Sequence, residues 1–322
     1  MKSRQFGTIG VLMGGYSSER EISLRSGAAV AEALSQEGHR VLPLDLADND
    51  AAKIIRQIEK IPLDIAFIAL HGRLGEDGTI QDILEKLGIP YTGCGVSTSQ
   101  LAFNKILTQK ALAAAGLPVP GNFCITDGVA LDFKSAWAQI KSTPIVVKPA
   151  CEGSSIGVSV VRHPSEWEPA LKGALNYGPQ VIIEEFIRGR EFTAGILDGE
   201  CLPLVEIRPN ASFFNFTAKY QKGATQYVCP AVLPEEWSAK IREISLRAAE
   251  TIGCQKFCRV DVRVDEGRGP FILEINTIPG FTGTSLFPKA ALEAGLSFVQ
   301  VCEKLLSLAL EGEGNLGKKV QR

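Results

Sequence analysis

The segment from Cys258 to Asn276 constrains the fold most strongly, because it reads as a β-hairpin that carries charges. Two apolar runs, CRVDVRV and PFILEIN, flank the polar turn DEGRG, a pattern typical of paired strands. Side chains on a strand alternate between its faces, so Arg259 and Asp261 share one face of the first strand. By the same rule, Glu274 and Asn276 share one face of the returning strand.

Charges in an otherwise apolar hairpin need partners, and these charges allow two interpretations. Two carboxylates and an amide oxygen are the ligands preferred by a hard cation such as Mg²⁺, which completes its coordination with water and substrate phosphates. The alternative is a charged hairpin edge in which Arg259 and Asp261 simply pair. The hairpin by itself leaves both interpretations open.

Composition excludes several classes of protein. The 322 residues are 45% hydrophobic and 22% charged, with a net charge near −2, which predicts a globular chain of two or three domains. Because the charges are interspersed, we expect no nucleic-acid partner. No apolar run approaches the ~18 residues of a membrane helix and no signal-peptide pattern is present, so we expect a cytoplasmic protein without a membrane partner. The eight cysteines form no CxxC pair, which predicts free thiols in a reducing cytosol.

The order of apolar runs predicts three regions and a tail. Strands and helices alternate over residues 1–103, which predicts an α/β domain with a Rossmann-like parallel sheet. A helix opens the second region, 104–188, and short strands dominate it. The third region, 189–311, is rich in strands before an amphipathic helix and the hairpin. We expect the polar segment 312–322 to be a disordered tail.

A loop of glycine and serine follows Lys148, at the end of the apolar run STPIVVKPA. Glycines let backbone N–H groups approach phosphate oxygens, and hydroxyls and a lysine add donors and charge. The loop residues are Gly153, Ser154, Ser155 and Gly157. Because the lysine precedes the glycines, this is not a Walker A loop, and an ordinary hairpin turn is the alternative.

Two polar residues follow apolar strands of the first region. The segment MGGYSSERE lacks the G-x-G-x-x-G pattern, and Glu19 occupies the place where a phosphate would bind. Its carboxylate could cap the following helix, or it could face a crevice and bind an ammonium group. His71 lies just past the strand DIAFIAL, where α/β folds bind ligands, although a lone histidine is more often structural.

Two further segments are ambiguous when taken alone. The strand VIIEEFI carries Glu184 and Glu185, with Glu191 farther on, which could form a solvated face or clasp a nucleotide base at a domain boundary. The glycine-containing stretch NFTAKYQKGATQY carries Lys219 and Tyr220, and it could be a lid or an ordinary surface loop.

Together, the motifs are specific. In chain order they are GGYSSEREIS, ALHGRLGEDG, VKPACEGSSIGV, EEFIRGREFT, AKY, GCQKFCRVDV and LEINTIPGFTGTS. This series, from Thr8 to Leu310, resembles the D-alanine–D-alanine ligase family of the ATP-grasp superfamily. The resemblance implies an ATP-grasp fold, α/β and α+β, with an N-terminal, a central and a C-terminal domain. ATP would be gripped between the last two.

The resemblance also implies a role for each matched residue. Two Mg²⁺ or Mn²⁺ ions would be held by Asp261, Glu274 and Asn276. ATP would contact Lys105, Lys148, Glu184, Glu185, Ile187, Glu191 and Lys219. The catalytic set would be Glu19, Ser154, Tyr220, Arg259 and Ser285. The substrate contacts would be Glu19, His71, Arg259, Gly280, Ser285 and Leu286.

The implied reaction joins two D-alanine molecules through a D-alanyl phosphate, for peptidoglycan precursor synthesis, in an enzyme that is commonly a homodimer. Glu19 would anchor the first ammonium group. Arg259 and the Gly280 N–H would stabilise the oxyanion. Tyr220 favours the dipeptide, because related ligases that make the D-alanyl–D-lactate ester lack this tyrosine. Cys151 in the phosphate loop is a departure that predicts sensitivity to thiol reagents.

Three rival functions remain to be weighed. Another ATP-grasp carboxylate–amine ligase would need a larger second pocket or would lack Glu19 or Tyr220. A regulatory module without catalysis would have little reason to keep the buried charges of the hairpin. A dinucleotide oxidoreductase is disfavoured, because G-x-G-x-x-G is absent.

Overall fold

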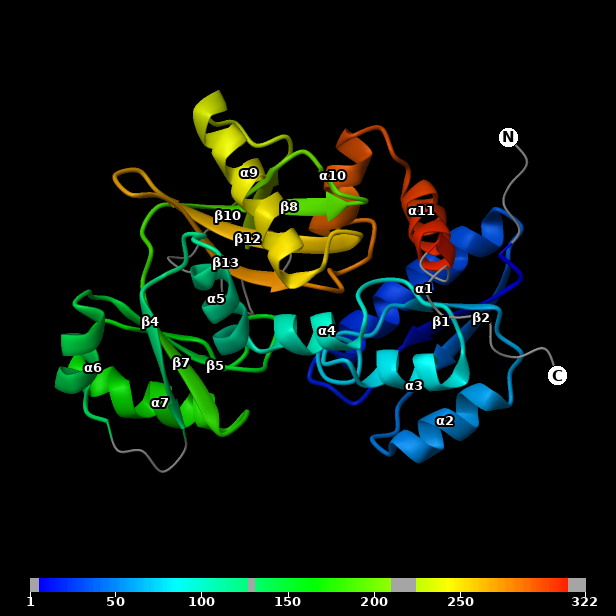
Figure 1. The fold of residues 1–322 in the computed structure, drawn as a ribbon, viewed down its shortest axis with the longest axis horizontal. Coiled ribbons are helices and arrows are strands. Elements are labelled where there is room, and N and C mark those ends of the chain that lie inside the picture. Colours follow the sequence, from blue (N-terminus) through cyan, green and yellow to red (C-terminus); the bar gives the residue numbers. More distant parts are fainter. Residues whose placement is uncertain (1–5, 127–130, 210–223, 312–322) are drawn as a thin grey trace.

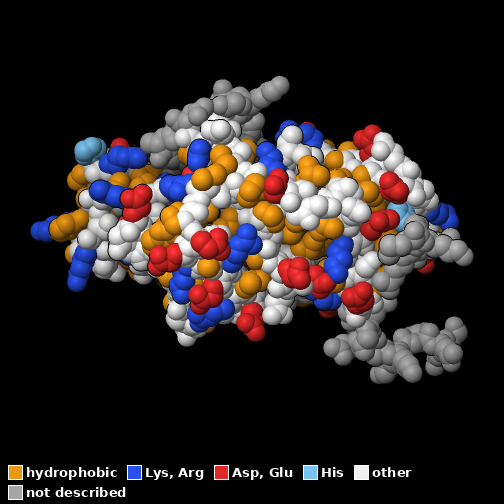
Figure 2. All heavy atoms as spheres, turned by 90° about the horizontal axis from the view of Figure 1, so that it is seen from above, with side chains coloured by type: hydrophobic (Ala, Val, Ile, Leu, Met, Phe, Trp, Pro, Cys, Tyr) orange, Lys and Arg blue, Asp and Glu red, His pale blue; other side chains and the backbone are white. Residues whose placement is uncertain are grey.

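The computed structural model describes residues 6–126, 131–209 and 224–311, and its strands form three sheets. In Figure 1 the first sheet lies at one end of the long axis and the second sheet lies toward the other end. The third sheet lies above the second. None of the helices in these residues has both the length and the apolar character needed to cross a bilayer. On the face drawn in Figure 2, acidic and basic side chains are interspersed.

The first sheet is parallel, as predicted, with strand order β2-β1-β3. Its strands are β1 (Thr8–Met13), β2 (Arg40–Asp45) and β3 (Ile65–Ile68). Its helices are α1 (Arg20–Gln36), α2 (Ala51–Glu59) and α3 (Thr79–Leu87). One apolar cluster joins α1 to the sheet and another joins α2 and α3 to it, so helices cover both faces.

The segment IPYTG, residues 89–93, joins this sheet through one bridge, between Ala66 and Tyr91. The Ala66 N–H donates to the Pro90 carbonyl at 2.8 Å, and the Thr92 N–H donates to the Ala66 carbonyl at 3.0 Å. Proline has no N–H, so the ladder cannot extend through Pro90.

The second sheet is antiparallel with the order β4-β7-β5-β6. Its strands are β4 (Asn122–Thr126), β5 (Ile145–Pro149), β6 (Ser159–Val161) and β7 (Gln180–Glu185). Two α-helices, α6 (Phe133–Ile140) and α7 (Trp167–Leu175), and the 3₁₀ turn η1 (Pro164–Glu166) accompany them. Ile145 and Val147 pack beneath these helices, so alternation turns Val146 and Lys148 to the opposite face.

The third sheet has the order β11-β10-β8-β12-β13, with β9 paired to β8. Its strands are β8 (Arg190–Leu197), β9 (Glu200–Cys201), β10 (Val205–Pro209), β11 (Thr225–Val228), β12 (Phe257–Asp265) and β13 (Gly269–Asn276). Helix α9 (Glu235–Ile252) covers one face. Cys258, Val260 and Val262 of β12 belong to the core under α9, so the intervening residues face the other way.

Four further helices connect or close these sheets. They are α4 (Val96–Phe103), α5 (Lys105–Ala114), α10 (Leu286–Glu293) and α11 (Phe298–Glu311). Helix α5 is the helix predicted to open the second region, whereas α4 and α10 were not anticipated from the sequence. Helix α11 returns to α1, where Leu305 and Leu306 share a core with Val30 and Leu34, so the end of the chain packs on its beginning (Figure 1).

The expectation of eight free thiols is wrong at two positions. Cys94 and Cys254 form a disulfide, with their Cα atoms 5.8 Å apart and 160 positions between them in sequence. Both residues are buried, and the cross-link connects the segment after the first sheet to the end of α9 in the third. Spacing along the chain could not reveal this pair, because only the packing of distant segments brings it together.

Candidate active site

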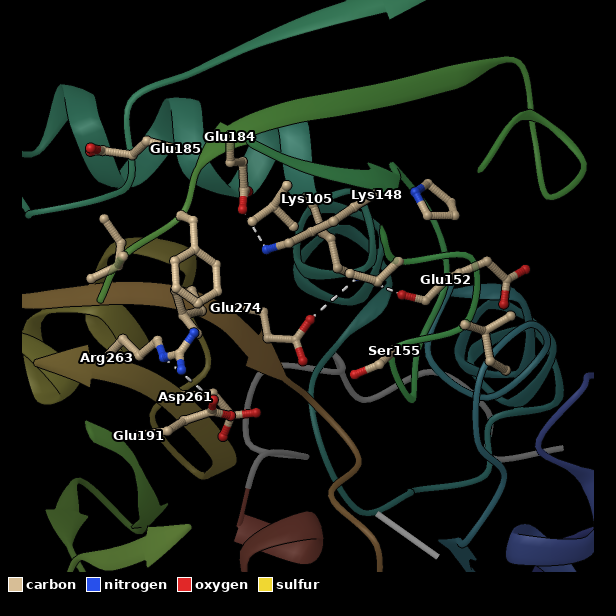
Figure 3. A pocket seen from close by; sticks show the side chains of 17 residues that line it. Lys105, Lys148, Glu152, Ser155, Glu184, Glu185, Glu191, Asp261, Arg263 and Glu274 are labelled. Atoms are coloured by element: carbon tan, nitrogen blue, oxygen red, sulfur yellow. Dashed lines mark hydrogen bonds and ion pairs between the residues drawn. The ribbon is translucent and has the colours of Figure 1, made fainter. Parts of the chain in front are cut away.

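The second and third sheets face each other across a polar cleft (Figure 3). Strands β5 and β7 supply one wall, β12 and β13 supply the other, and the glycine–serine loop closes one end. The lining includes Lys105, Val146, Lys148, Glu152, Ser155, Glu184, Phe186, Ile187, Glu191, Asp261, Arg263, Leu273 and Glu274.

The predicted hairpin is confirmed, and its register brings the charged residues into direct opposition. Arg259 lies opposite Asn276, and Asp261 lies opposite Glu274, on paired antiparallel strands. The register then shifts, so that Val262 pairs with Ile272 and Leu273 is passed over. This bulge re-aims the strand, and it explains why the neighbours Leu273 and Glu274 both line the cleft.

Asp261 is the most heavily hydrogen-bonded residue of the hairpin. Its carboxylate accepts two hydrogen bonds from the Arg259 guanidinium, both at 2.9 Å. The Thr193 hydroxyl donates to it at 2.6 Å and the Asn276 amide nitrogen at 3.1 Å. The simple pairing of Arg259 and Asp261 is therefore present, and it uses the same carboxylate that a metal ion would need.

Lys105 bridges the phosphate loop and the hairpin. Its ammonium group donates to the Glu152 carbonyl and lies 3.4 Å from the Glu274 carboxylate. The cleft also raises the pKa of the Glu152 carboxyl above its ordinary value, chiefly because burial disfavours the charged form. Lys105 thus lies between the glycine–serine loop and the Glu274 carboxylate of the hairpin.

Lys148 faces the cleft from β5 and forms an ion pair with Glu184 of β7 (Figure 3). Glu184 is only 1% exposed, and it also accepts a hydrogen bond from the Gln109 side chain. Gln109 accepts in turn from the Asn122 amide at 2.7 Å, which fixes the orientation of its own amide group. Gln109 and Asn122 therefore hold the carboxylate that partners Lys148, and no motif in the sequence identified either residue.

Glu185 is turned away from Lys148 (Figure 3). Its carboxylate accepts hydrogen bonds from Arg268 at 2.8 and 2.9 Å and from the Gly121 N–H at 2.9 Å. The Arg268 guanidinium lowers the pKa of the Glu185 carboxyl. The Glu185 side chain is therefore engaged by Arg268 and the Gly121 N–H. Ile187, two residues on, is buried in the cleft wall.

Arg263 is a cleft residue that the motifs missed. It follows Arg259 and Asp261 at the same two-residue spacing on β12, so the alternation that placed those residues also turns Arg263 into the cleft. Its guanidinium lies 4.8 Å above the Phe186 ring and 3.7 Å from the Glu191 carboxylate. Burial lowers the pKa of this guanidinium.

Glu19 lies in a second polar region, a corner where the first sheet meets the loop of Gly153 and Ser154. The residue is the N-cap that precedes α1, but its side chain makes no capping hydrogen bond, so the capping interpretation is wrong. Its buried carboxylate instead accepts from the Ser154 hydroxyl, 135 positions away in sequence. A Cβ added at Gly153 would lie 2.5 Å from this carboxylate, so either the Glu19 side chain or the loop would have to move to accept it.

His71 is buried, and protein groups engage both of its ring nitrogens. Nδ1 lies 3.1 Å from the Ile278 carbonyl, which can only accept, so this nitrogen carries the proton. Nε2 lies 3.1 Å from the Ser26 hydroxyl, which also accepts from the Phe281 N–H at 3.2 Å. The structural role of His71 is therefore visible, and a direct substrate contact would require one of these bonds to break.

Gly280, Ser285 and Leu286 gather at the start of α10. Ser285 precedes the helix, and its hydroxyl accepts from the Thr282 N–H at 3.0 Å. A Cβ at Gly280 would lie 3.2 Å from this hydroxyl, which shows how closely the two residues approach. A helix N-terminus presents N–H groups and a positive dipole end, which suits a carboxylate.

Two predicted site residues, Lys219 and Tyr220, lie outside the described residues. Over residues 6–126, 131–209 and 224–311, no group of three or more His, Cys, Asp or Glu side chains is arranged to hold a metal ion. The proposed ligand set of Asp261, Glu274 and Asn276 has only two carboxylates. Its all-oxygen chemistry fits a hard cation that takes its other ligands from phosphates and water.

Comparison with protein-family models finds two matches. Residues 112–307 match the model described as "D-ala D-ala ligase C-terminus", and residues 47–94 match "D-ala D-ala ligase N-terminus". The larger match includes the hairpin, the phosphate loop and the start of α10.

Individual relatives match over nearly the full length. The chain is 43% identical to a D-alanine–D-alanine ligase from Geobacter sulfurreducens, over 95% of this chain and 96% of the relative. It is 46% identical to one from Desulforudis audaxviator, over 94% and 98%. The crystal structure of a D-alanine–D-alanine ligase from Bacillus anthracis complexed with ATP superposes with a TM-score of 0.84 at 32% identity, covering 97% of this chain and all of that one. A D-Ala:D-Ser ligase from Enterococcus faecalis gives a TM-score of 0.78 at 28% identity, covering 95% of this chain and all of that one.

Proposed function

Because the chain belongs to the D-alanine–D-alanine ligase family, we propose that it joins two D-alanine molecules, using ATP and releasing ADP and phosphate. The product, D-alanyl-D-alanine, serves peptidoglycan precursor synthesis. The observation that carries this proposal is the hairpin of β12 and β13, where Asp261 and Glu274 line one cleft with Lys105 and Arg259 holds Asp261.

The first step activates a carboxylate. Glu19 holds the ammonium group of the first D-alanine, whose carboxylate attacks the γ-phosphorus of ATP and displaces ADP. Lys105 and Lys148 offset negative charge on the transferring phosphoryl group, because both lie on the cleft wall beside the phosphate loop. The product is a D-alanyl phosphate.

The second step forms the peptide bond. The amine of the second D-alanine attacks the acyl phosphate carbonyl, giving a tetrahedral intermediate that expels phosphate. Arg259 and the Gly280 N–H donate to the oxyanion, a role worth about 3 to 4 kcal/mol per donor. The N-terminus of α10, with Ser285 and Leu286, receives the carboxylate of the second substrate.

Two Mg²⁺ or Mn²⁺ ions would be held by Asp261, Glu274 and Asn276. The fit rests on oxygen donors that lie on facing strands, with Asp261 directly opposite Glu274. The Asn276 amide nitrogen donates to Asp261, so the amide oxygen of Asn276 points away from that carboxylate. Bound ions would supply charge neutralisation for the phosphoryl group.

Four finer assignments belong to the same proposal. The chain divides into domains at 1–103, 104–188 and 189–311, a division supported by the three separate sheets. The protein acts as a homodimer in the cytoplasm. Glu184, Ile187 and the Glu185 backbone clasp adenine. Tyr220 favours D-alanine over D-lactate as the second substrate.

The deciding experiment measures phosphate release from ATP and Mg²⁺ at neutral pH. D-Alanine alone is expected to give rapid release, whereas L-alanine gives none and added D-lactate or D-serine gives no mixed product. A matched variant, Glu19→Gln, is expected to raise KM for D-alanine without weakening ATP binding. Folded protein that binds ATP but releases no D-alanine-dependent phosphate would reject the proposal. A D-serine adduct formed as fast as the D-alanine dipeptide would reassign the second substrate.

A further inference from the structure

The second sheet is attached to the rest of the chain by two adjacent connections. One leads from α5 into β4, and the other leads from β7 into β8. Asn122 of β4 pairs with Glu184 of β7, so the two connections leave the sheet side by side. The Glu185 N–H donates to the Gly121 carbonyl at 2.9 Å, which extends this pairing by one step. Two adjacent connections allow a sheet to turn about them as about a hinge.

Beyond this point, both connections are fixed to the third sheet. The Ile272 N–H of β13 donates to the Pro118 carbonyl at 2.9 Å. Gly189 has a φ of 107°, and a Cβ there would lie 1.9 Å from the Val264 carbonyl oxygen, so its backbone lies directly against β12. The freedom to turn is therefore confined to the segments between the fixed points, which we call the hinge. They are residues 119–121 and 186–188.

An ion pair crosses the hinge. Arg268, in the turn between β12 and β13, donates two hydrogen bonds to the Glu185 carboxylate, at 2.8 and 2.9 Å, from 83 positions away in sequence. The Gly121 N–H donates to the same carboxylate at 2.9 Å. Glu185 is therefore held both by the third sheet and by the hinge. The ion pair of Lys148 and Glu184, in contrast, stays within the second sheet.

Arg268 is held in place on its own side. The Asp265 carboxylate accepts from the Gly267 N–H at 3.0 Å and from the Arg268 N–H at 3.1 Å, which fixes the turn. The Arg268 guanidinium lies 4.5 Å from the centre of the Phe271 ring. It lowers the pKa of the Glu185 carboxyl, so this carboxylate stays charged at neutral pH.

Exposed ion pairs generally contribute little to stability, but this pair differs from them in its geometry. The Glu185 side chain is only 12% exposed. A bidentate pair needs two N–H groups in line with two carboxylate oxygens, so it fixes an orientation as well as a distance. Rotation of the second sheet about the hinge would break at least one of the two hydrogen bonds.

The pair connects the two walls of the cleft. The hairpin that carries Arg268 also carries Asp261 and Glu274, and the strand that carries Glu185 pairs with the strand that carries Lys148. A ligand that contacts both walls at once needs them at one spacing and one angle. The Arg268–Glu185 pair sets that angle without itself facing Lys148, because Glu185 is turned away from it (Figure 3).

We propose that Arg268 is a positioning residue that acts through Glu185 to fix the angle between the two walls before ATP binds. The inference rests on the proposed function only in taking ATP as the ligand of the cleft. Without the pair, ATP binding must itself order the hinge, and the affinity falls by that cost. Once ATP is bound, its own contacts hold the walls together, so the rate at saturation changes little.

The first test is a binding measurement. Calorimetry with Mg²⁺ and no D-alanine gives Kd for ATP. Arg268→Met keeps the apolar stem over Phe271 and removes the donors, and it is expected to raise Kd about 3- to 10-fold. Its kcat at saturating substrates should stay within about twofold of wild type. Glu185→Gln should give a similar rise in Kd, and the double variant no larger one, because the two residues act as one pair.

Hydrogen exchange followed by mass spectrometry reports on the hinge directly. Without nucleotide, the amides of segments 117–122 and 183–190 should exchange about tenfold faster in Arg268→Met than in wild type. Saturating ATP should restore the wild-type rate, since the nucleotide then bridges the walls. A residue that only packs over Phe271 would change exchange in the hairpin and leave the hinge as it is.

The matched control is Lys240→Met. Its side chain is as exposed as that of Arg268, at 48%, but its ion pair with Glu243 lies within α9. We expect it to change neither Kd for ATP nor exchange in the hinge. For Arg268→Met, an unchanged Kd or unchanged hinge exchange overturns the inference, and so do additive effects in the double variant. If Arg268→Met does not fold, the wild type decides: hinge amides without protection in the absence of nucleotide overturn the inference.

The two proposals fail in different ways. If the wild type binds ATP and Arg268→Met loosens the hinge, but no D-alanine-dependent phosphate is released, the ligase function is rejected and the role of Arg268 is kept. If the wild type ligates D-alanine and Arg268→Met binds ATP as tightly as wild type does, only the role of Arg268 is rejected.

Discussion

The charged hairpin and the corner around Glu19 are both buried and polar, but they are built in different ways. On the hairpin, Arg259, Asp261 and Asn276 are joined by hydrogen bonds within one pair of strands. At the corner, Glu19 meets Ser154 only because the first sheet and the phosphate loop dock together, across 135 positions of sequence.

This difference means that the two sites depend on different parts of the fold. The hairpin geometry depends on strand register, so it persists as long as the third sheet is folded. The corner around Glu19 depends on the position of the loop that carries Ser154. In this loop Ser154 and Ser155 have left-handed φ angles of 51° and 59°. We therefore expect hairpin substitutions to reduce the rate of reaction and corner substitutions to weaken substrate binding.

The largest effect is expected from Arg259→Met. Loss of an oxyanion donor lowers kcat by about 100- to 1,000-fold, while KM for ATP changes little, because the guanidinium acts on the carbonyl. Steady-state phosphate release measures both constants. Arg25→Met, on the exposed side of α1, is the matched control and should retain full activity. A kcat within threefold of wild type would remove Arg259 from the chemistry and leave it as a structural partner of Asp261.

A smaller and different effect is expected from Gly153→Ala. The new Cβ would lie 2.5 Å from the Glu19 carboxylate, so the carboxylate or the loop must shift. KM for D-alanine should rise about tenfold or more with a smaller change in kcat, since the groups that bind the ammonium separate. Gly173→Ala in α7 is the control, because a Cβ there meets nothing within 4 Å. A Gly153→Ala variant with unchanged KM would show that the corner tolerates movement.

The same difference explains how far the sequence could predict the site. Alternation along one strand was enough to place Arg259 with Asp261, and extending it by two residues finds Arg263. The bulge at Leu273 gives no signal in the sequence, so the presence of Leu273 beside Glu274 in the cleft was not foreseen. Glu19 and Ser154 were placed in one catalytic set only through resemblance to a family, because no local rule joins residues so far apart.

Secondary structure follows the same pattern. The longer helices α1 and α9 were predicted from the sequence. Helix α10 was missed because it is short and carries Pro288 in its first turn. A proline there is tolerated, since the first N–H groups of a helix have no partner within it. Because α10 was not predicted, the sequence did not indicate the helix N-terminus at which we propose that the second substrate binds.

Alkylation of Cys151 tests the corner with a smaller perturbation. Burial raises the pKa of this half-buried thiol above its ordinary value of 9.0, so the reactive thiolate is scarce at neutral pH. Inactivation by iodoacetamide should accelerate about tenfold for each pH unit up to pH 9, because the thiolate fraction rises by that factor below the pKa. Activity measured after timed alkylation should fall several-fold. Cys151→Ser should abolish the loss, whereas Cys124→Ser, at an exposed position on β4, should not. Inactivation that is independent of pH would assign it to another residue.

The smallest effect on catalysis is expected at the disulfide between Cys94 and Cys254, which ties the first region to α9 without touching the cleft. Protein purified without reductant and then denatured should titrate six thiols, rising to eight after reduction. A cross-link across 160 positions restricts the unfolded chain, so Cys254→Ser should lower the free energy of unfolding by up to about 4 kcal/mol. Its kcat should stay within about twofold of wild type, because the hairpin register does not depend on the bond. A large fall in kcat would mean that docking of the first region also controls the hairpin geometry. The hairpin and the Glu19 corner would then not be independent.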